Sequence, residues 1–380
     1  MITREKSYTL GDRYEKSKKK ISDLLTDYID ELYLFDDNQE KITFKTETLI
    51  PSCDPAKANI LLLFSNPHPG SVKTGMFLCT RKHNPSRFWW FMRDAGWFNI
   101  LNIDYVSENL KKIFLGGLHE GPFNLFFDCF YDFPTEDPKD LVKIFGKEFF
   151  HQEIQQTAKS KIADTVRAHK IDAIVSFNGQ VTALLTGRNL KGYIRKLNNG
   201  ELLKFIYSGD DNTVLDVPMY QSYPTGFHYV EDITKKRHHN LTRIREDIVL
   251  DTISKNAAKT EGVMISEPSV LFRIGKYFSP DLSPVELYDV TRGRWKMGRN
   301  REKAHLAFAI YKHIIIEVYE IAQWFPAGTT LSARLDPPPP DRWEFVGNIA
   351  PPQMRDKYIN KSVEHYFRAG ARTVFRYINI

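Results

Sequence analysis

The chain has 380 residues, a formal net charge of +6, 42% hydrophobic residues and 13% aromatic residues. This length exceeds a typical single domain and the apolar content is enough for more than one core, so we expect two domains. The three cysteines lack paired spacing, which excludes a zinc site of the usual cysteine patterns and a four-cysteine iron–sulfur cluster; no metal or cofactor is expected.

The scattered cysteines and the charged N-terminus indicate a reduced, cytoplasmic protein, with the prokaryotic cytosol favoured. The longest apolar stretch, 304–325, is interrupted by Lys312, His313 and Glu317. It is therefore not expected to span a membrane. The mild positive charge suits a nucleic-acid partner without requiring one.

In chain order, residues 1–47 predict an N-terminal helical extension, because apolar residues recur at helical spacing over 12–35. A first buried strand follows at 59–65. The segment 86–96 predicts a helix that ends at a glycine, and 123–130 predicts a second buried strand.

The middle of the chain continues the same alternation. Residues 138–169 predict helix, 171–179 a third strand, 180–187 a short helix, 217–227 a fourth strand and loop, and 231–253 a helix. Strands that alternate with helices predict an α/β domain with a mainly parallel sheet in three layers. We place it at 48–253.

A polar segment at 254–262 predicts a linker, and the amino-acid composition changes after it. Residues 263–380 are rich in β-branched and aromatic residues, which predicts a second, β-rich α+β domain of no family that we can name. Within it, 292–303 interleaves arginines and lysines with Trp295. This segment is either a DNA contact or an exposed hairpin.

Four segments, in order and at similar spacing, resemble the uracil-DNA glycosylase superfamily, closest to its mismatch-specific uracil and thymine-DNA glycosylase branch. They are "LLLFSNPHPG", "HNPSRFWWFMRDAGWF", "AIVSFNGQVTALLTG" and "YPTGFH". They are similar to the branch's Gly-Ile-Asn-Pro-Gly strand end, its Pro-x-Asn-x-Phe-Trp-Lys helix, its Phe-Asn-Gly-Lys turn and its Asn-Pro-Ser-Gly-Leu-Ser loop. The resemblance covers about residues 58–245 and implies that branch's three-layer fold.

The resemblance places Asn66 on the branch's catalytic asparagine, with Phe64-Ser65 in place of Gly-Ile. An asparagine cannot act as a general base, so it would position the attacking water. Pro67 would fix the chain so that the Asn66 side chain points out of the strand end. The alternative is an ordinary Asx turn followed by proline.

The resemblance also implies a base pocket and a DNA-binding loop. Phe77 would stack on the flipped base, with a core phenylalanine as the alternative, and Ser65 and Asn178 would line the pocket. Phe227 would enter the space left by the base, or else pack in the core. The DNA wedge and backbone contacts would be Tyr223, Pro224, Thr225, Gly226, Phe227, His228, Lys236 and Arg237. Tyr223 departs from the His, Asn or Met of the branch.

Asp128, near the end of the second predicted strand, stands where thymine-specific relatives have an asparagine. An ionised carboxylate only accepts hydrogen bonds, so it suits the N4 amino group of cytosine better than the carbonyls of uracil. A protonated Asp128 would instead act as a catalytic residue, donating to a ring atom of the base and helping it leave. The sequence therefore predicts excision of a 5-modified cytosine, such as those of phage DNA, which would serve antiviral defence. The alternative is that Asp128 is a buried, hydrogen-bonded carboxylate that does not contact the base.

The favoured function is thus a monofunctional DNA glycosylase, a hydrolase that flips a modified pyrimidine in double-stranded or single-stranded DNA and leaves an abasic site. Base excision of uracil or mismatched thymine for repair is one alternative. A non-catalytic reader of modified bases is another. A nuclease ranks third, because no nuclease pattern is evident in 263–380.

Overall fold

The protein is described here from a computed structural model. The chain divides into two compact units, Met1–Arg245 and Glu246–Ile380, and each is described by itself. The predicted linker falls almost entirely outside the described residues. The structure describes residues 2–79, 85–100, 107–188, 202–208, 214–222, 240–252, 262–275, 277–278, 282–331, 338–367 and 373–380.

The first unit is built on a five-stranded sheet of order β5-β4-β6-β8-β7. The first four strands are parallel, and β7 is antiparallel to β8. This confirms the expected mixed α/β class with parallel strands. The strands are β4 (Ala58–Phe64), β5 (Phe123–Cys129), β6 (Ala173–Ser176), β7 (Leu203–Ser208) and β8 (Val214–Gln221).

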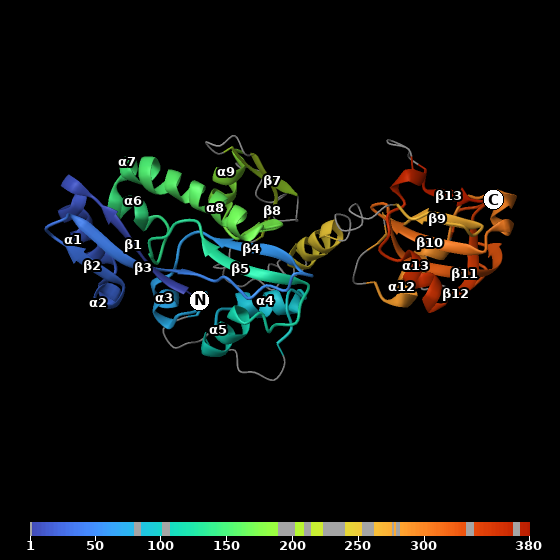
Figure 1. The fold of residues 1–380 in the computed structure, drawn as a ribbon, viewed down its shortest axis with the longest axis horizontal. Helices are drawn as coiled ribbons and strands as arrows, with labels where there is room; N and C mark the ends of the chain where they lie inside the picture. The colour runs from blue at the N-terminus through green and yellow to red at the C-terminus, as the bar shows by residue number, and fades with distance from the viewer. Residues whose placement is uncertain are drawn as a thin grey trace. The chain divides into compact units, whose positions relative to one another are not determined.

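Helices cover both faces of this sheet, with α4 and α5 on one side and α8 and α9 on the other (Figure 1). Because both faces are covered, β5 is buried at every residue. The helices are α3 (Pro69–Thr74), α4 (Phe88–Asp94), α5 (Ser107–Leu115), α6 (Asp140–Phe145), α7 (Lys147–Phe149), a π-helical turn (Phe150–Ile154), α8 (Gln155–His169) and α9 (Gly179–Thr186).

The N-terminal segment differs from the predicted helical extension. It does contain α1 (Tyr14–Leu24) and α2 (Ile29–Leu32). It also forms an antiparallel sheet of order β1-β3-β2. Its strands are β1 (Ile2–Thr9), β2 (Tyr33–Asp36) and β3 (Lys41–Thr48).

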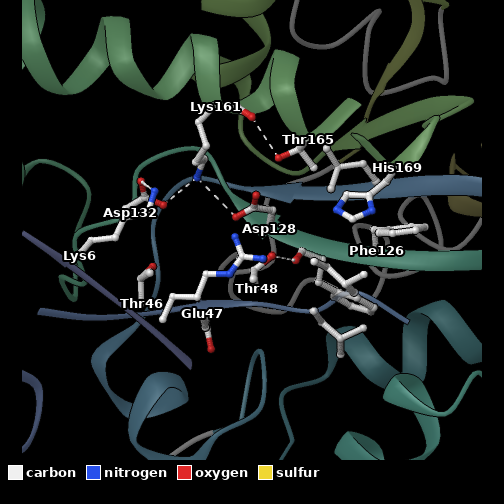
Figure 2. A pocket seen from close by; sticks show the side chains of 15 residues that line it. Lys6, Thr46, Glu47, Thr48, Phe126, Asp128, Asp132, Lys161, Thr165 and His169 are labelled. Atoms are coloured by element: carbon white, nitrogen blue, oxygen red, sulfur yellow. Dashed lines mark hydrogen bonds and ion pairs between the residues drawn. The ribbon is translucent and has the colours of Figure 1, made fainter. Parts of the chain in front are cut away.

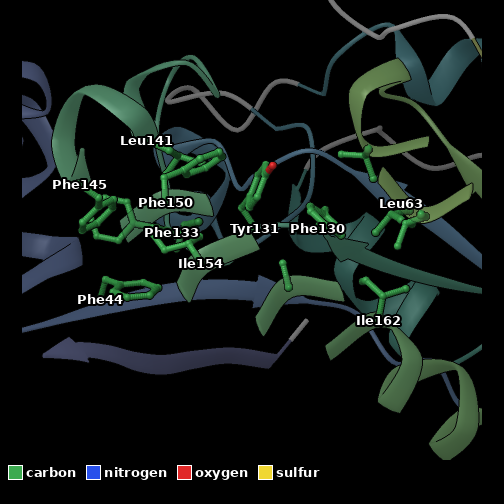
Figure 3. Close-up of a cluster of buried hydrophobic side chains, with 14 of the residues drawn as sticks. Phe44, Leu63, Phe130, Tyr131, Phe133, Leu141, Phe145, Phe150, Ile154 and Ile162 are labelled. Carbon is green, nitrogen blue, oxygen red and sulfur yellow. The ribbon is translucent and has the colours of Figure 1, made fainter. Parts of the chain in front are cut away.

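This N-terminal layer belongs to the first unit and shares its core. Phe44 of β3 lies in one buried cluster with Leu63 of β4 and Phe145 of α6 (Figure 3). Just after β3, Leu49 exchanges two backbone hydrogen bonds with Phe127 of β5, at 2.8 and 3.0 Å. The boundary predicted at residue 48 therefore does not separate two bodies.

The second unit is a five-stranded sheet of order β12-β11-β10-β9-β13, in which only β9 and β10 are parallel. The apolar stretch 304–325 forms most of the β10–β11 hairpin. No helix among the described residues has the length and apolar character needed to cross a bilayer. The elements are β9 (Ser269–Arg273), α12 (Pro284–Arg292), β10 (Leu306–Tyr311), β11 (Ile314–Pro326), β12 (Trp343–Ile349), α13 (Pro352–Tyr358) and β13 (Phe375–Ile378).

Candidate functional site

The strand order of the first unit indicates where on its sheet a ligand would bind. The chain leaves β4 to form β5 on one side and then returns to form β6 on the other side of β4. In open α/β sheets, ligands bind outside the carboxyl ends of strands where the order reverses in this way. Asn66 is the second residue after β4 and Asn178 the second after β6, so the two asparagines flank this point.

The Asn66 amide is held in one orientation. Its Nδ2 donates to the carbonyl oxygen of Thr135 at 2.8 Å and to that of Pro67 at 3.2 Å, and both oxygens are acceptors only. It also donates to Thr135 Oγ1 at 2.9 Å, because the Thr135 hydroxyl donates its own proton to the Asp137 carbonyl. These are the only hydrogen bonds that the Asn66 side chain makes to described residues. Because all three bonds use Nδ2, the Asn66 Oδ1 remains able to accept a hydrogen bond.

The loop that carries Asn66 is fixed to the loop after β5. The backbone N–H groups of Phe130 and Tyr131 donate to the carbonyls of Phe64 and Ser65, both at 2.8 Å. The N–H of Thr135 donates to the carbonyl of Pro67 at 3.1 Å. Ser65 and Asn66 are half-buried, whereas Thr135 is buried. The asparagine thus rests on a rigid support, as a positioning role requires.

Asn178 is the N-cap residue of α9. Its Oδ1 accepts from the backbone N–H groups of Gln180 at 2.9 Å and Val181 at 3.1 Å. Its Nδ2 makes no hydrogen bond to the described residues, so the amide presents a donor. At the carboxyl edge of neighbouring strands, Asn66 thus offers an acceptor and half-buried Asn178 offers a donor.

Asp128 is the last residue but one of β5, in register with Leu63 of β4, and its assignment as a base-reading residue stays a prediction. Its side chain lines a cavity of about 60 Å³ beneath α8, together with Lys161 and Asp132 (Figure 2). Its Oδ1 accepts from the Cys129 N–H at 2.8 Å and lies 3.4 Å from Lys161 Nζ. Asn66 does not line this cavity. Asp128 is thus buried and hydrogen-bonded, as the alternative for this residue describes.

Two lysines pair with Asp132 beside Asp128, whereas Glu47, which lines the same cavity, has its Oε2 without a hydrogen-bond partner among the described residues. Lys161 Nζ lies 2.9 Å from Asp132 Oδ1, and Lys6 Nζ lies 2.6 Å from Asp132 Oδ2. Burial acts to raise the pKa of Asp132, but the two ammonium groups outweigh it and the pKa is lowered. Burial raises the pKa of Asp128 above its usual value, against the opposing effect of Lys161. This network joins β1, β5 and α8.

Phe77 is also not placed to stack on a base. Its side chain is 1% exposed. Its ring packs against Phe64 and Phe127, with centroids 5.8 and 5.6 Å apart. The core role, which was the alternative for this residue, is the one that the structure shows.

The predicted wedge and backbone contacts fall outside the described residues. These are Tyr223, Pro224, Thr225, Gly226, Phe227, His228, Lys236 and Arg237. The last described position before them is Ser222, which directly follows β8 and is buried. The sequence predictions for this segment therefore stay predictions.

Sequence reasoning missed Thr135, the residue that orients Asn66. It lies 69 positions away from Asn66 in a loop without regular pattern, so no spacing connects the two. It also missed Lys161, which occupies one position of an ordinary amphipathic helix.

The chain matches no protein-family model, and no curated protein matches it at a significant level. Across the part of the chain that the structure describes, no three His, Cys, Asp or Glu side chains gather as metal ligands would.

Proposed function

We propose that this protein is a DNA glycosylase that hydrolyses the N-glycosidic bond of a flipped pyrimidine nucleotide and leaves an abasic site. One observation carries the proposal: Asn66, anchored through Nδ2, presents Oδ1 at the carboxyl end of β4, where the strand order reverses. The four-segment resemblance supports the same reading, and the net positive charge suits a DNA substrate.

In this proposal Asn66 positions the water. Oδ1 accepts a hydrogen bond from the water, whose oxygen attacks C1′ of the deoxyribose. The C1′–N bond breaks, the base departs with the bonding electron pair, and the attacking water loses a proton to solvent. Since an amide does not take the proton, catalysis rests on orientation and on stabilisation of the departing anion.

Asn178 supplies the second half of the site. The cap bonds fix its Oδ1, so its Nδ2 is directed by the helix start rather than by a mobile side chain. A donor there suits a carbonyl oxygen of the base, on which negative charge develops as the bond breaks. Uracil, thymine and cytosine all carry the O2 carbonyl, so this contact selects pyrimidines without choosing among them.

The preference for a 5-modified cytosine was based on Asp128. Because the Asp128 carboxylate lies 3.4 Å from Lys161 Nζ, we do not use this residue to choose among pyrimidines. We therefore propose a pyrimidine glycosylase, for which uracil, mismatched thymine and 5-modified cytosine are the substrates to compare.

The experiment is incubation of the full chain with duplex and single-stranded oligonucleotides that carry each of these bases, followed by alkali. Breaks that require alkali indicate an abasic site and support the proposal. Breaks without alkali indicate a nuclease, and binding without any break indicates a reader of modified bases. Either of the last two results contradicts the proposal.

A further inference from the structure

The second unit carries a basic segment that the proposed function does not use. Residues 293–303 contain five cationic residues and one acidic residue, Glu302. The segment is fixed to the start of β12, because Trp295 and Trp343 exchange two backbone hydrogen bonds at 3.0 and 2.9 Å. This pairing places the basic segment beside Arg342.

Two open hollows adjoin these tryptophans. One, of about 510 Å³, is lined by Lys296, Arg342 and Trp343, among others, and by the acidic Asp341. The other, of about 450 Å³, is lined by Tyr277, Arg294, Trp295 and Arg342, among others. Arg342 lines both hollows, and its Nη1 donates to the Arg294 carbonyl at 3.5 Å. We name Tyr277, Arg294, Trp295, Lys296, Arg342 and Trp343 the tryptophan surface.

Both tryptophan rings are held rigidly. Trp295 stacks on Phe272, with ring centroids 4.7 Å apart, and its Nε1 donates to the Thr291 carbonyl at 2.7 Å. The Arg301 guanidinium carbon lies 3.4 Å from the centroid of the Trp343 ring. Each half-buried ring thus has one partner inside the protein and also forms part of a hollow's wall.

We propose that the tryptophan surface binds a segment of single-stranded DNA, with one base against each tryptophan and the phosphates between them on Arg342 and Lys296. Fixed aromatic rings combined with cations are the usual means of binding single strands without base specificity. A duplex keeps its bases stacked and has none to offer to the rings. An acidic peptide satisfies the cations but leaves both rings unused.

This inference goes beyond the proposed function, because the surface lies in the second unit and does not involve Asn66. The probe is an oligothymidylate with one 5-iodouracil, added to the full chain. After irradiation, mass spectrometry identifies the crosslinked peptides. We expect crosslinks in the peptides that contain Trp295 or Trp343. Crosslinks confined to Met1–Arg245 would overturn the inference.

Affinity measurements give a second readout. The pair Lys296→Ala and Arg342→Ala is expected to lower the magnitude of the log–log salt slope by about 1.4, from two single-strand phosphate contacts at about 0.7 each. The matched control is Lys357→Ala, which removes an exposed cation of the same unit that pairs with Glu267. A control that lowers the slope as much as the pair would contradict the inference.

Trp343→Ala tests the rings and should weaken binding about 5- to 150-fold, whereas Trp343→Phe should retain most of the affinity. Equal losses on duplex DNA would indicate a backbone-binding surface, and competition by polyglutamate an acidic-peptide surface; both outcomes overturn the inference. Because base excision is scored separately, a failure here leaves the proposed function standing.

Discussion

Replacement of Lys161 by Met should destabilise the first unit strongly. Lys161 Nζ lies 2.9 Å from Asp132 and 3.4 Å from Asp128, and its side chain is 15% exposed. Removal of one partner from a buried ion pair costs about 3–5 kcal/mol. Asp132 keeps Lys6 at 2.6 Å, so Asp128 is the carboxylate left without a cation. We therefore expect a loss at the lower end of that range, about 3 kcal/mol at neutral pH.

The loss should depend on pH in a defined direction. Burial already raises the pKa of Asp128 and Lys161 opposes this effect, so without Lys161 the folded-state pKa of Asp128 rises further and the folded variant binds more protons than its unfolded form. Its stability then falls as pH rises above the unfolded carboxyl pKa of about 3.9. In the wild type the pKa of Asp132 is lowered, so its contribution is present above that pH and is lost as pH falls through the folded value. The difference between the two proteins should therefore grow from about pH 4 to pH 7.

Hydrogen exchange of β5 and α8 peptides across a urea series reports the first unit separately from the second. With a urea dependence of about 3 kcal/mol per molar, the midpoint should fall by about 1 M at neutral pH. The matched control is Lys204→Met, whose pair with Asp216 is exposed on both sides, at 58% and 50%, and should cost under about 1 kcal/mol. Equal shifts for both variants, or a shift at pH 7 no larger than at pH 4, would refute the reasoning.

Three further predictions follow from the site. Asn178→Ala should destabilise the protein by about 0.5–2 kcal/mol through loss of the α9 cap and should also slow base release, whereas Asn178→Asp should keep the cap; urea unfolding and excision rates on the same samples check this. Lys236→Ala with Arg237→Ala should lower the magnitude of the salt slope for duplex DNA by about 0.9 per lost phosphate contact, and an unchanged slope would make this run a solvated surface. Asp128→Asn should leave the ratio of excision rates on uracil and 5-modified cytosine unchanged; a shift in that ratio would return Asp128 to the base pocket.

The sequence was informative where periodicity is strong. The strands at 59–65 and 123–130, the helical region 138–169 and the short helix 180–187 lie close to their predicted places. The residues of β1, such as Thr3, Arg4 and Glu5, are mostly polar and exposed and give no apolar alternation from which a strand could be predicted. β3 has alternating Ile42 and Phe44, a usable signal that was overlooked.

The site was harder to predict than the fold, for physical reasons. All of β5 is buried, so period-2 alternation cannot tell which side of the sheet Asp128 faces. Phe77 is one of 26 phenylalanines. No local sequence feature distinguishes a phenylalanine that packs in the core from one that stacks on a base. A strand end followed by Asn-Pro is a local signal that draws attention to Asn66, whereas Thr135, which orients it, is joined to it only by the fold.

The central claim is that Asn66 positions the water that releases the base. The most direct test is single-turnover base excision on the best substrate, with the wild type, Asn66→Ala and the distant control Asn348→Ala, and with DNA affinity measured in parallel. The account predicts that Asn66→Ala lowers the excision rate at least about 100-fold while affinity changes little, and that the control keeps both. An Asn66→Ala protein that excises at the wild-type rate would contradict it.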